Sequence, residues 1–194
     1  MTDKKLYIIS GCNGAGKTTA SFNILPDLLK CKEFVNADEI ARGISPFQPE
    51  KVSIEAGRLM LKRIDELMNS GQDFSFETTL SSKSFIQTII DAKARGYYVT
   101  LIFFWLESVE LAKDRVLKRV SEGGHNIVEN VIERRYKNGI INLFNLYETK
   151  VDYLLIYDNS NTNAQLVAEK ELNSQYLIHQ IAKFQTIKAI SNEQ

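Results

Sequence analysis

A glycine-rich segment near the amino terminus carries residue types that bind phosphate groups. Residues 11–18 read GCNGAGKT and match the pattern G-x-x-x-x-G-K-[ST] at every fixed position. The segment follows an apolar run, residues 6–9, and opens a stretch with helical character. In such a strand–turn–helix unit, backbone N–H groups converge on one point, and the helix amino terminus adds partial positive charge there. The segment therefore predicts a site for the phosphates of a nucleotide.

Each position of this loop has an expected role. We expect Lys17 to reach the β- and γ-phosphates and the Thr18 hydroxyl to be a ligand of Mg²⁺. Cys12 is either a thiol activated by the helix terminus or a small residue that fits the turn, and the second interpretation is favoured. The predicted nucleotide-binding residues are Gly11, Asn13, Gly14, Ala15, Gly16, Lys17, Thr18 and Thr19.

Acidic residues follow three further apolar runs. Asp38 follows residues 34–35, Glu77 follows 74–76, and Asp158 follows 153–157. Ligands of open α/β sheets bind outside the carboxyl ends of the strands, so we expect these carboxylates near the phosphate loop. Three carboxylates are more than a magnesium site needs, and the surplus suggests a hydroxyl group that is to be deprotonated.

Asp38 is the candidate that orients an acceptor hydroxyl and takes its proton. The alternative is that Asp38 caps a helix beginning at Glu39. Glu77 is expected to bind substrate or to hold a magnesium-bound water, with Thr78 and Thr79 beside it as further substrate contacts. Asp158 is expected in a loop beside the nucleotide base.

Cations for a phosphoryl-transfer site are concentrated between residues 115 and 137. Two predicted helices joined at Gly123-Gly124 are typical of a lid that closes over phosphates. Arg119 and Arg134 are favoured as catalytic because they flank the glycine break, although a solvated basic helix face is the alternative for any single arginine. The cations of the segment are Arg115, Lys118, Arg119, Arg134, Arg135 and Lys137.

Strand and helix patterns alternate along the chain, which favours a parallel sheet with helices on its faces. The predicted strands are 5–9, 34–35, 74–76, 97–106 and 153–157, with 165–170 as an antiparallel edge strand. The predicted helices are 17–25, 51–70, 84–95, 109–120, 127–147 and 175–189. The continuous hydrophobicity of 97–106 places that strand in the middle of the sheet. We therefore predict one α/β domain over 1–194 with a helical lid at about 115–137.

Composition narrows the functional classes. Lys plus Arg and Asp plus Glu number 24 each, so no net charge attracts the chain to nucleic acid or to a membrane. Two cysteines provide no disulfide framework and are typical of a reducing compartment. The amino terminus leads directly into a strand, and no apolar stretch reaches the ~18 residues of a spanning helix. These observations predict a cytoplasmic protein.

Five segments together resemble the zeta toxin family, most closely its short chromosomal members, often described as predicted ABC-type ATPases. They are GCNGAGKT, VNADEIARG (35–43), SFETTLSS (75–82), the 119–135 stretch with GGH, and YDNS (157–160), in order over about residues 5–170. The resemblance implies a P-loop kinase fold, a three-layer P-loop NTPase of the nucleoside-kinase type. It also implies phosphorylation of a small molecule with ATP or GTP and Mg²⁺. In the toxins proper, the substrate is UDP-N-acetylglucosamine, phosphorylated on the 3′-hydroxyl of the amino sugar. The resemblance also implies an antitoxin protein as a possible partner.

The resemblance assigns roles by position. Lys17 and Thr18 fall on the phosphate and metal residues, and Asp38 falls on the catalytic base. Arg42 falls on the arginine of the same motif, Glu77 and Thr79 fall on sugar-nucleotide contacts, and Arg119 and Arg134 fall on the paired lid arginines. One extra residue separates Asp38 from Arg42, and no aromatic residue lies between them. The lid spacing is longer than in the toxins, which leaves Arg135 as the alternative to Arg134.

Three other functions are alternatives to a small-molecule kinase, and each is disfavoured. Residues 120–125 (VSEGGH) faintly resemble an ABC signature, so an ABC- or AAA-like ATPase without a small-molecule acceptor is one of them. It is disfavoured because no Walker B Asp-Glu pair follows a central strand. A nucleotide-binding interaction module without activity is disfavoured because Lys17, Thr18 and Asp38 are all present. A GTPase is disfavoured because no Asp-x-x-Gly or Asn-Lys-x-Asp motif occurs.

Overall fold

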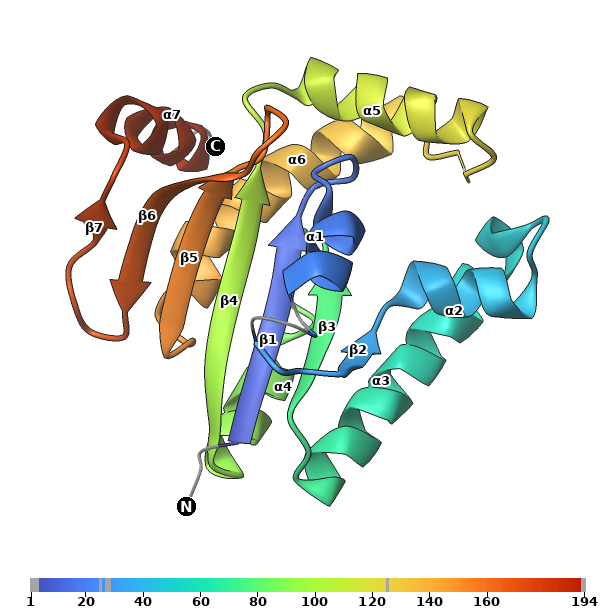
Figure 1. The fold of residues 1–194 in the computed structure, drawn as a ribbon, viewed down its shortest axis with the longest axis horizontal. Coiled ribbons are helices and arrows are strands. Elements are labelled where there is room, and N and C mark those ends of the chain that lie inside the picture. Colours follow the sequence, from blue (N-terminus) through green and yellow to red (C-terminus); the bar gives the residue numbers. More distant parts are fainter. Residues whose placement is uncertain (1–3, 25, 27–28, 125, 193–194) are drawn as a thin grey trace.

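The computed structural model describes residues 4–24, 26, 29–124 and 126–192. In this part of the chain, seven strands form one sheet in the order β2-β3-β1-β4-β5-β6-β7 (Figure 1). Strands β1 to β5 are parallel, and β6 and β7 are antiparallel additions at one side. The strands are β1 (Lys4–Gly11), β2 (Glu33–Val35), β3 (Phe74–Thr78), β4 (Tyr97–Trp105), β5 (Tyr153–Asp158), β6 (Gln165–Glu171) and β7 (Leu177–Ile178).

Helices cover both faces of the sheet, and α5 lies beyond the carboxyl ends of the central strands in Figure 1. The helices are α1 (Lys17–Ile24), α2 (Ala37–Ile44), α3 (Ser53–Ser70), α4 (Ile86–Ala94), α5 (Val109–Ser121), α6 (Glu129–Asn142) and α7 (Ile181–Ser191). A 3-10 turn, Pro49–Val52, precedes α3, and a π-helical turn, Leu143–Tyr147, continues α6.

The central strands are apolar throughout because both of their faces are covered. Along β1, Leu6 and Ile8 join the hydrophobic cluster beneath α3 and α4, whereas Tyr7 and Ile9 join the cluster beneath α5. This alternation follows from the two-residue period of a strand. The result is a three-layer domain whose buried sheet holds the strand ends in fixed positions.

The predicted fold class is confirmed, including the place of β4 at the centre of the sheet. The predicted helix at 175–189 begins later, at Ile181, because residues 177–178 pair with β6. Strand β6 is therefore not the edge strand. Leu25 and His125, which fall in the predicted first helix and the lid loop, lie outside the described residues.

The parallel register brings the carboxyl ends of three strands to one edge. Ser10 pairs with Thr78, Ile9 pairs with Glu77, and Val35 pairs with Phe76. The phosphate loop, the residues that follow β2 and the tip of β3 therefore lie side by side.

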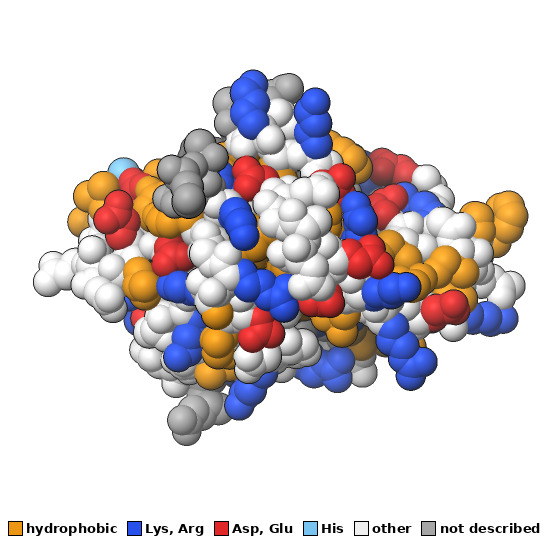
Figure 2. Space-filling view, turned by 90° about the horizontal axis from the view of Figure 1, so that it is seen from below, with side chains coloured by type: hydrophobic (Ala, Val, Ile, Leu, Met, Phe, Trp, Pro, Cys, Tyr) orange, Lys and Arg blue, Asp and Glu red, His pale blue; other side chains and the backbone are white. Residues whose placement is uncertain are grey.

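The amino-terminal edge of the sheet lies on the opposite side of the molecule. Figure 2 shows positive and negative side chains interspersed over the described part of that face. No helix of the described residues has the length and apolarity needed to span a membrane.

Candidate active site

The phosphate loop is held in place by packing that only glycine permits. Gly14 and Gly16 have φ values of 80° and 77°, which favour glycine. A Cβ atom at Gly14 would lie 2.6 Å from the Ala112 carbonyl oxygen of α5, and one at Gly16 would lie 2.5 Å from Asn159 Nδ2. Asn159 Nδ2 donates a hydrogen bond to the Ala15 carbonyl oxygen at 2.8 Å. The loop is thus braced between α5 and the segment that follows β5.

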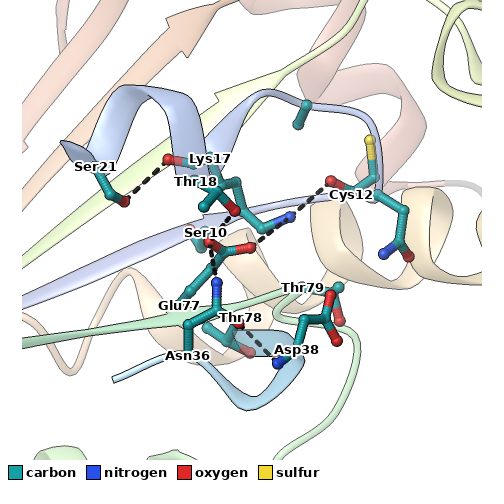
Figure 3. Close-up of polar contacts among 12 residues, drawn as sticks. Ser10, Cys12, Lys17, Thr18, Ser21, Asn36, Asp38, Glu77, Thr78 and Thr79 are labelled. Carbon is teal, nitrogen blue, oxygen red and sulfur yellow. Dashed lines mark hydrogen bonds and ion pairs between the residues drawn. The ribbon is translucent and has the colours of Figure 1, made fainter. Parts of the chain in front are cut away.

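Lys17 and Thr18 meet Glu77 where the loop becomes α1. Lys17 is buried, and its Nζ donates to the Cys12 carbonyl oxygen at 2.9 Å and lies 3.4 Å from Glu77 Oε1. The Thr18 hydroxyl donates to Glu77 Oε2 at 2.8 Å, and Asn36 Nδ2 donates to the same oxygen at 2.9 Å. Figure 3 shows Glu77 between the Lys17–Thr18 pair and Asn36. One carboxylate therefore joins the phosphate loop to the ends of β2 and β3.

The capping role considered for Asp38 belongs to Asn36. The Asn36 side-chain oxygen accepts hydrogen bonds from the backbone N–H groups of Asp38 at 2.8 Å and Glu39 at 3.4 Å. Asp38 lies in the first turn of α2, and its side chain is exposed. The capping interpretation of Asp38 is wrong, and its carboxylate is left available to a ligand.

Two cavities meet at Asp38, Lys17 and Glu77. The loop cavity, of about 270 Å³, is also bordered by Thr18, Thr19 and Arg119. The α3 cavity, of about 480 Å³, is also bordered by Asn13, Asn36, Thr78, Thr79, Arg135 and one side of α3. A group in the first cavity and a group in the second can therefore both reach the space between Lys17 and Asp38.

A third hollow, the outer cleft of about 900 Å³, opens from Thr18 and Thr19 toward solvent. It is bordered by Asp38, Arg42 and Arg119. Arg42 lies 3.3 Å from Glu39 in an exposed ion pair and does not border the α3 cavity. Its predicted substrate role therefore applies to the outer cleft.

Helices α5 and α6 bring Arg119 and Arg135, rather than Arg134, to these cavities. Arg119 borders the loop cavity and the outer cleft. Arg135 Nη1 donates to Asn13 Oδ1 at 3.0 Å, whereas Arg134 is exposed and borders none of the three cavities. Burial lowers the pKa of the Arg135 guanidinium, and nearby Asp38 opposes that shift. Because adjacent helix residues point about 100° apart, only one of the two arginines can face the loop.

The surroundings of two other residues, Asp158 and Cys12, indicate a structural role. Asp158 is 3% exposed and lies 2.6 Å from Lys183 of α7, an ion pair that joins the carboxyl-terminal helix to β5, and it borders none of the three cavities. Burial raises the pKa of the Cys12 thiol to about 11, although Lys17 acts to lower it. The thiol form is therefore favoured, in agreement with a small residue that fits the turn.

Sequence reasoning overlooked Asn36 and assigned no role to Asn159. An Asn immediately before a helix is a capping signal, and it could have identified Asn36. The contact of Asn159 with Ala15 joins residues 144 positions apart, and no local pattern indicates it.

A mostly parallel sheet with a glycine-rich loop at the end of β1, a lysine that bonds back to that loop and an arginine of α6 that bonds to it define a P-loop kinase fold. The zeta toxin family matches residues 2–171 of this sequence. The chain therefore belongs to the zeta toxin family. A curated relative, an uncharacterized protein of Haemophilus influenzae, is 35% identical over 144 residues, which cover 70% of this chain and all of the relative.

Solved structures share the fold at low sequence identity. The AvrRxo1-ORF1:AvrRxo1-ORF2 complex with sulphate ions matches with a TM-score of 0.79 at 17% identity, over 98% of this chain and 65% of the matched chain. The same complex with ATP matches with a TM-score of 0.77. The PezAT chromosomal toxin–antitoxin system of Streptococcus pneumoniae matches with a TM-score of 0.67 at 16% identity, over 99% and 87% of the two chains. This chain thus spans just under two thirds of the AvrRxo1 chain that it matches.

Proposed function

We propose that this protein transfers the γ-phosphoryl group of ATP or GTP to a hydroxyl group of a sugar nucleotide such as UDP-N-acetylglucosamine, in the cytoplasm. The observation that carries the proposal is that Asp38 and Lys17 border both the loop cavity and the α3 cavity. A nucleotide on the loop and an alcohol in the α3 cavity would meet between a cation and an exposed carboxylate.

The residues around this space fit the requirements of phosphoryl transfer. As the acceptor oxygen bonds to the γ-phosphorus, the bond from that phosphorus to the bridging oxygen breaks, and Asp38 takes the hydroxyl proton. Lys17, Arg119 and Arg135 supply positive charge around the transferred group. Closure of α5 and α6 excludes water, which would otherwise compete with the alcohol.

The Thr18 hydroxyl and the Glu77 carboxylate fit a magnesium ion. They are oxygen donors, the type that Mg²⁺ prefers, and they lie 2.8 Å apart beside the loop. When bound, Mg²⁺ neutralises the charge that develops on the nucleotide phosphates. Glu77 also orients Thr18 and Asn36 through its hydrogen bonds to them. Thr78 and Thr79 contact the acceptor from the wall of the α3 cavity.

The relatives support parts of this proposal. A structure of the same fold solved with ATP supports a nucleotide as the donor. The PezAT toxin–antitoxin system supports an antitoxin as a partner of this chain. The sugar-nucleotide acceptor rests on membership in the zeta toxin family.

A transfer assay tests the proposal. The purified protein is incubated with Mg²⁺ and ATP or GTP against UDP-sugars and other hydroxyl-bearing metabolites, and products are read by mass spectrometry. We expect one acceptor class to gain a phosphoryl group and to accelerate nucleoside-diphosphate formation. Equal nucleotide hydrolysis with and without every acceptor would favour the ABC- or AAA-like ATPase instead.

A further inference from the structure

The segment that follows β3 has a backbone conformation that its own residues do not favour. We call residues 79–82 the β3 loop, and its Thr79, Ser81 and Ser82 border the α3 cavity. Leu80 has a φ of 58°, in the left-handed region that residues other than glycine rarely adopt, and its side chain is fully buried. Such strain persists only where the surrounding structure maintains it, and it is concentrated at functional sites. Contacts from outside the β3 loop are therefore needed to hold it.

Helix α6 and the π-helical turn that continues it supply these contacts. Asn142 Nδ2 donates a hydrogen bond to the Leu80 carbonyl oxygen at 2.8 Å. The Tyr147 hydroxyl donates to the Ser82 carbonyl oxygen at 2.7 Å. Tyr147 is fully buried, and burial raises the pKa of its hydroxyl, which therefore keeps the proton that it donates. Two side chains thus hold the backbone of the β3 loop.

The π-helical turn allows both side chains to reach the same loop. Asn142 and Tyr147 are five residues apart, and in an α-helix such positions point about 140° away from each other. In the π-helical turn, the Glu148 N–H donates to the Leu143 carbonyl oxygen, five residues back, at 2.9 Å. This wider winding brings positions five residues apart toward one side of the helix. π-Helical turns are rare, and those that occur are frequent at functional sites.

The same helix also contacts the phosphate loop. Arg135 donates to Asn13 of that loop at 3.0 Å. Gly139, one turn later, lets α6 approach the β3 loop closely, because a Cβ atom there would lie 2.8 Å from the Thr79 carbonyl oxygen. Helix α6 therefore fixes the position of the β3 loop relative to the phosphate loop.

We propose that Asn142 and Tyr147 are positioning residues of the phosphoryl-transfer site. They hold the β3 loop in the conformation that presents the hydroxyl groups of Thr79 and Ser81 to the acceptor. These two hydroxyl oxygens lie 2.9 Å apart, and a change in the backbone of Leu80, which lies between the two residues, would separate them. Neither Asn142 nor Tyr147 borders the α3 cavity, so both act through the loop. The proposal rests on the proposed function, because it concerns the acceptor of that reaction.

Hydrogen exchange and transfer kinetics test this role together. Tyr147→Phe and Asn142→Leu each remove one hydrogen bond and keep most of the volume of the side chain. We expect both variants to speed amide exchange over residues 79–85 about tenfold and to leave residues 11–18 unchanged. The transfer assay uses UDP-N-acetylglucosamine, or the acceptor that the screen identifies in its place. We expect the KM for this acceptor to rise about fivefold or more, while kcat and the affinity for a non-hydrolysable ATP analogue stay within about twofold of the wild type.

Two matched controls come from the same chain. Tyr97→Phe removes another buried hydroxyl, which donates to two backbone carbonyl oxygens at 3.2 and 2.8 Å near the amino-terminal edge of the sheet. Asn145→Leu repeats the replacement made at Asn142 at an exposed position of the π-helical turn. Both controls should keep the wild-type KM for the acceptor, even where Tyr97→Phe lowers Tm as much as Tyr147→Phe does. A purely structural role of Tyr147 would make the two tyrosine variants equal in acceptor KM.

The proposal is overturned if Tyr147→Phe and Asn142→Leu keep the wild-type KM for the acceptor, or if the controls raise it as much. If one of the two variants does not fold, the other decides. An active wild type whose variants keep the acceptor KM retains the kinase function and loses only this proposal. A wild type that phosphorylates no acceptor loses the proposed function as well, so the two failures are distinguishable.

Discussion

Replacing Asn36 by alanine should weaken the fold and the site together. Asn36 is 6% exposed, and its side chain both caps α2 and donates to Glu77 at 2.9 Å. Loss of an amino-terminal cap costs about 1 kcal/mol, and loss of a buried hydrogen bond to a charged group costs about 1.5 kcal/mol. We expect Asn36→Ala to lower the free energy of unfolding by about 2.5 kcal/mol, or Tm by roughly 5–10 °C in a chain of this size.

The measurement is urea unfolding of the wild type, Asn36→Ala and Asn36→Asp. Aspartate keeps the cap but places a second carboxylate against Glu77, so Asn36→Asp should retain α2 and disturb the position of Thr18. We therefore expect Asn36→Asp to weaken magnesium-dependent nucleotide binding, despite an intact cap. A loss below about 0.5 kcal/mol for Asn36→Ala would refute the double role of this side chain.

Three further predictions concern the arginines of α6, the ion pair between Asp158 and Lys183, and Cys12 of the phosphate loop. We expect Arg135→Ala to lower kcat in the transfer assay about a hundredfold and Arg134→Ala to keep a kcat near that of the wild type. A larger loss of kcat for Arg134→Ala than for Arg135→Ala would contradict the assignment of Arg135 to the site. Burial acts to raise the pKa of Asp158, but hydrogen bonds from Lys183 and Ser160 lower it overall. Its carboxylate thus stabilises the fold above the unfolded pKa of about 3.9, and this contribution is lost as pH falls through the folded pKa. We therefore expect Lys183→Met to reduce the pH dependence of the free energy of unfolding below about pH 4. An unchanged pH dependence would contradict a stabilising ion pair between Asp158 and Lys183. Because burial raises the pKa of Cys12 to about 11, iodoacetamide at pH 8 should modify it only in unfolded protein, and rapid labelling of the native protein would show that the thiol is accessible.

The parts of the fold that depend on local pattern were predictable. The loop motif specifies its turn through glycines at fixed positions, and the apolar run of β4 could only belong to a strand covered on both faces. The start of α7 was not predictable, because Leu177 and Ile178 are exposed and form a strand only by pairing with β6. Such pairing is a tertiary contact with no local signal.

In the candidate site, too, some residues were predictable from local pattern and others were not. Lys17, Thr18 and Glu77 were placed together by the rule that strand ends meet at one edge. Whether Arg134 or Arg135 faces the loop depends on how α6 is rotated about its axis. An error of one residue in placing the helix would exchange the two arginines.

The central claim is that Asp38 takes the acceptor's proton while Lys17 and its loop hold the nucleotide. The most direct test is to measure both nucleotide affinity and phosphoryl transfer for Asp38→Asn. We expect the nucleotide affinity to stay within about twofold of the wild type and transfer to fall by roughly a hundred- to ten-thousand-fold. Near wild-type turnover by Asp38→Asn would contradict the assignment of the base and, with it, the proposed mechanism.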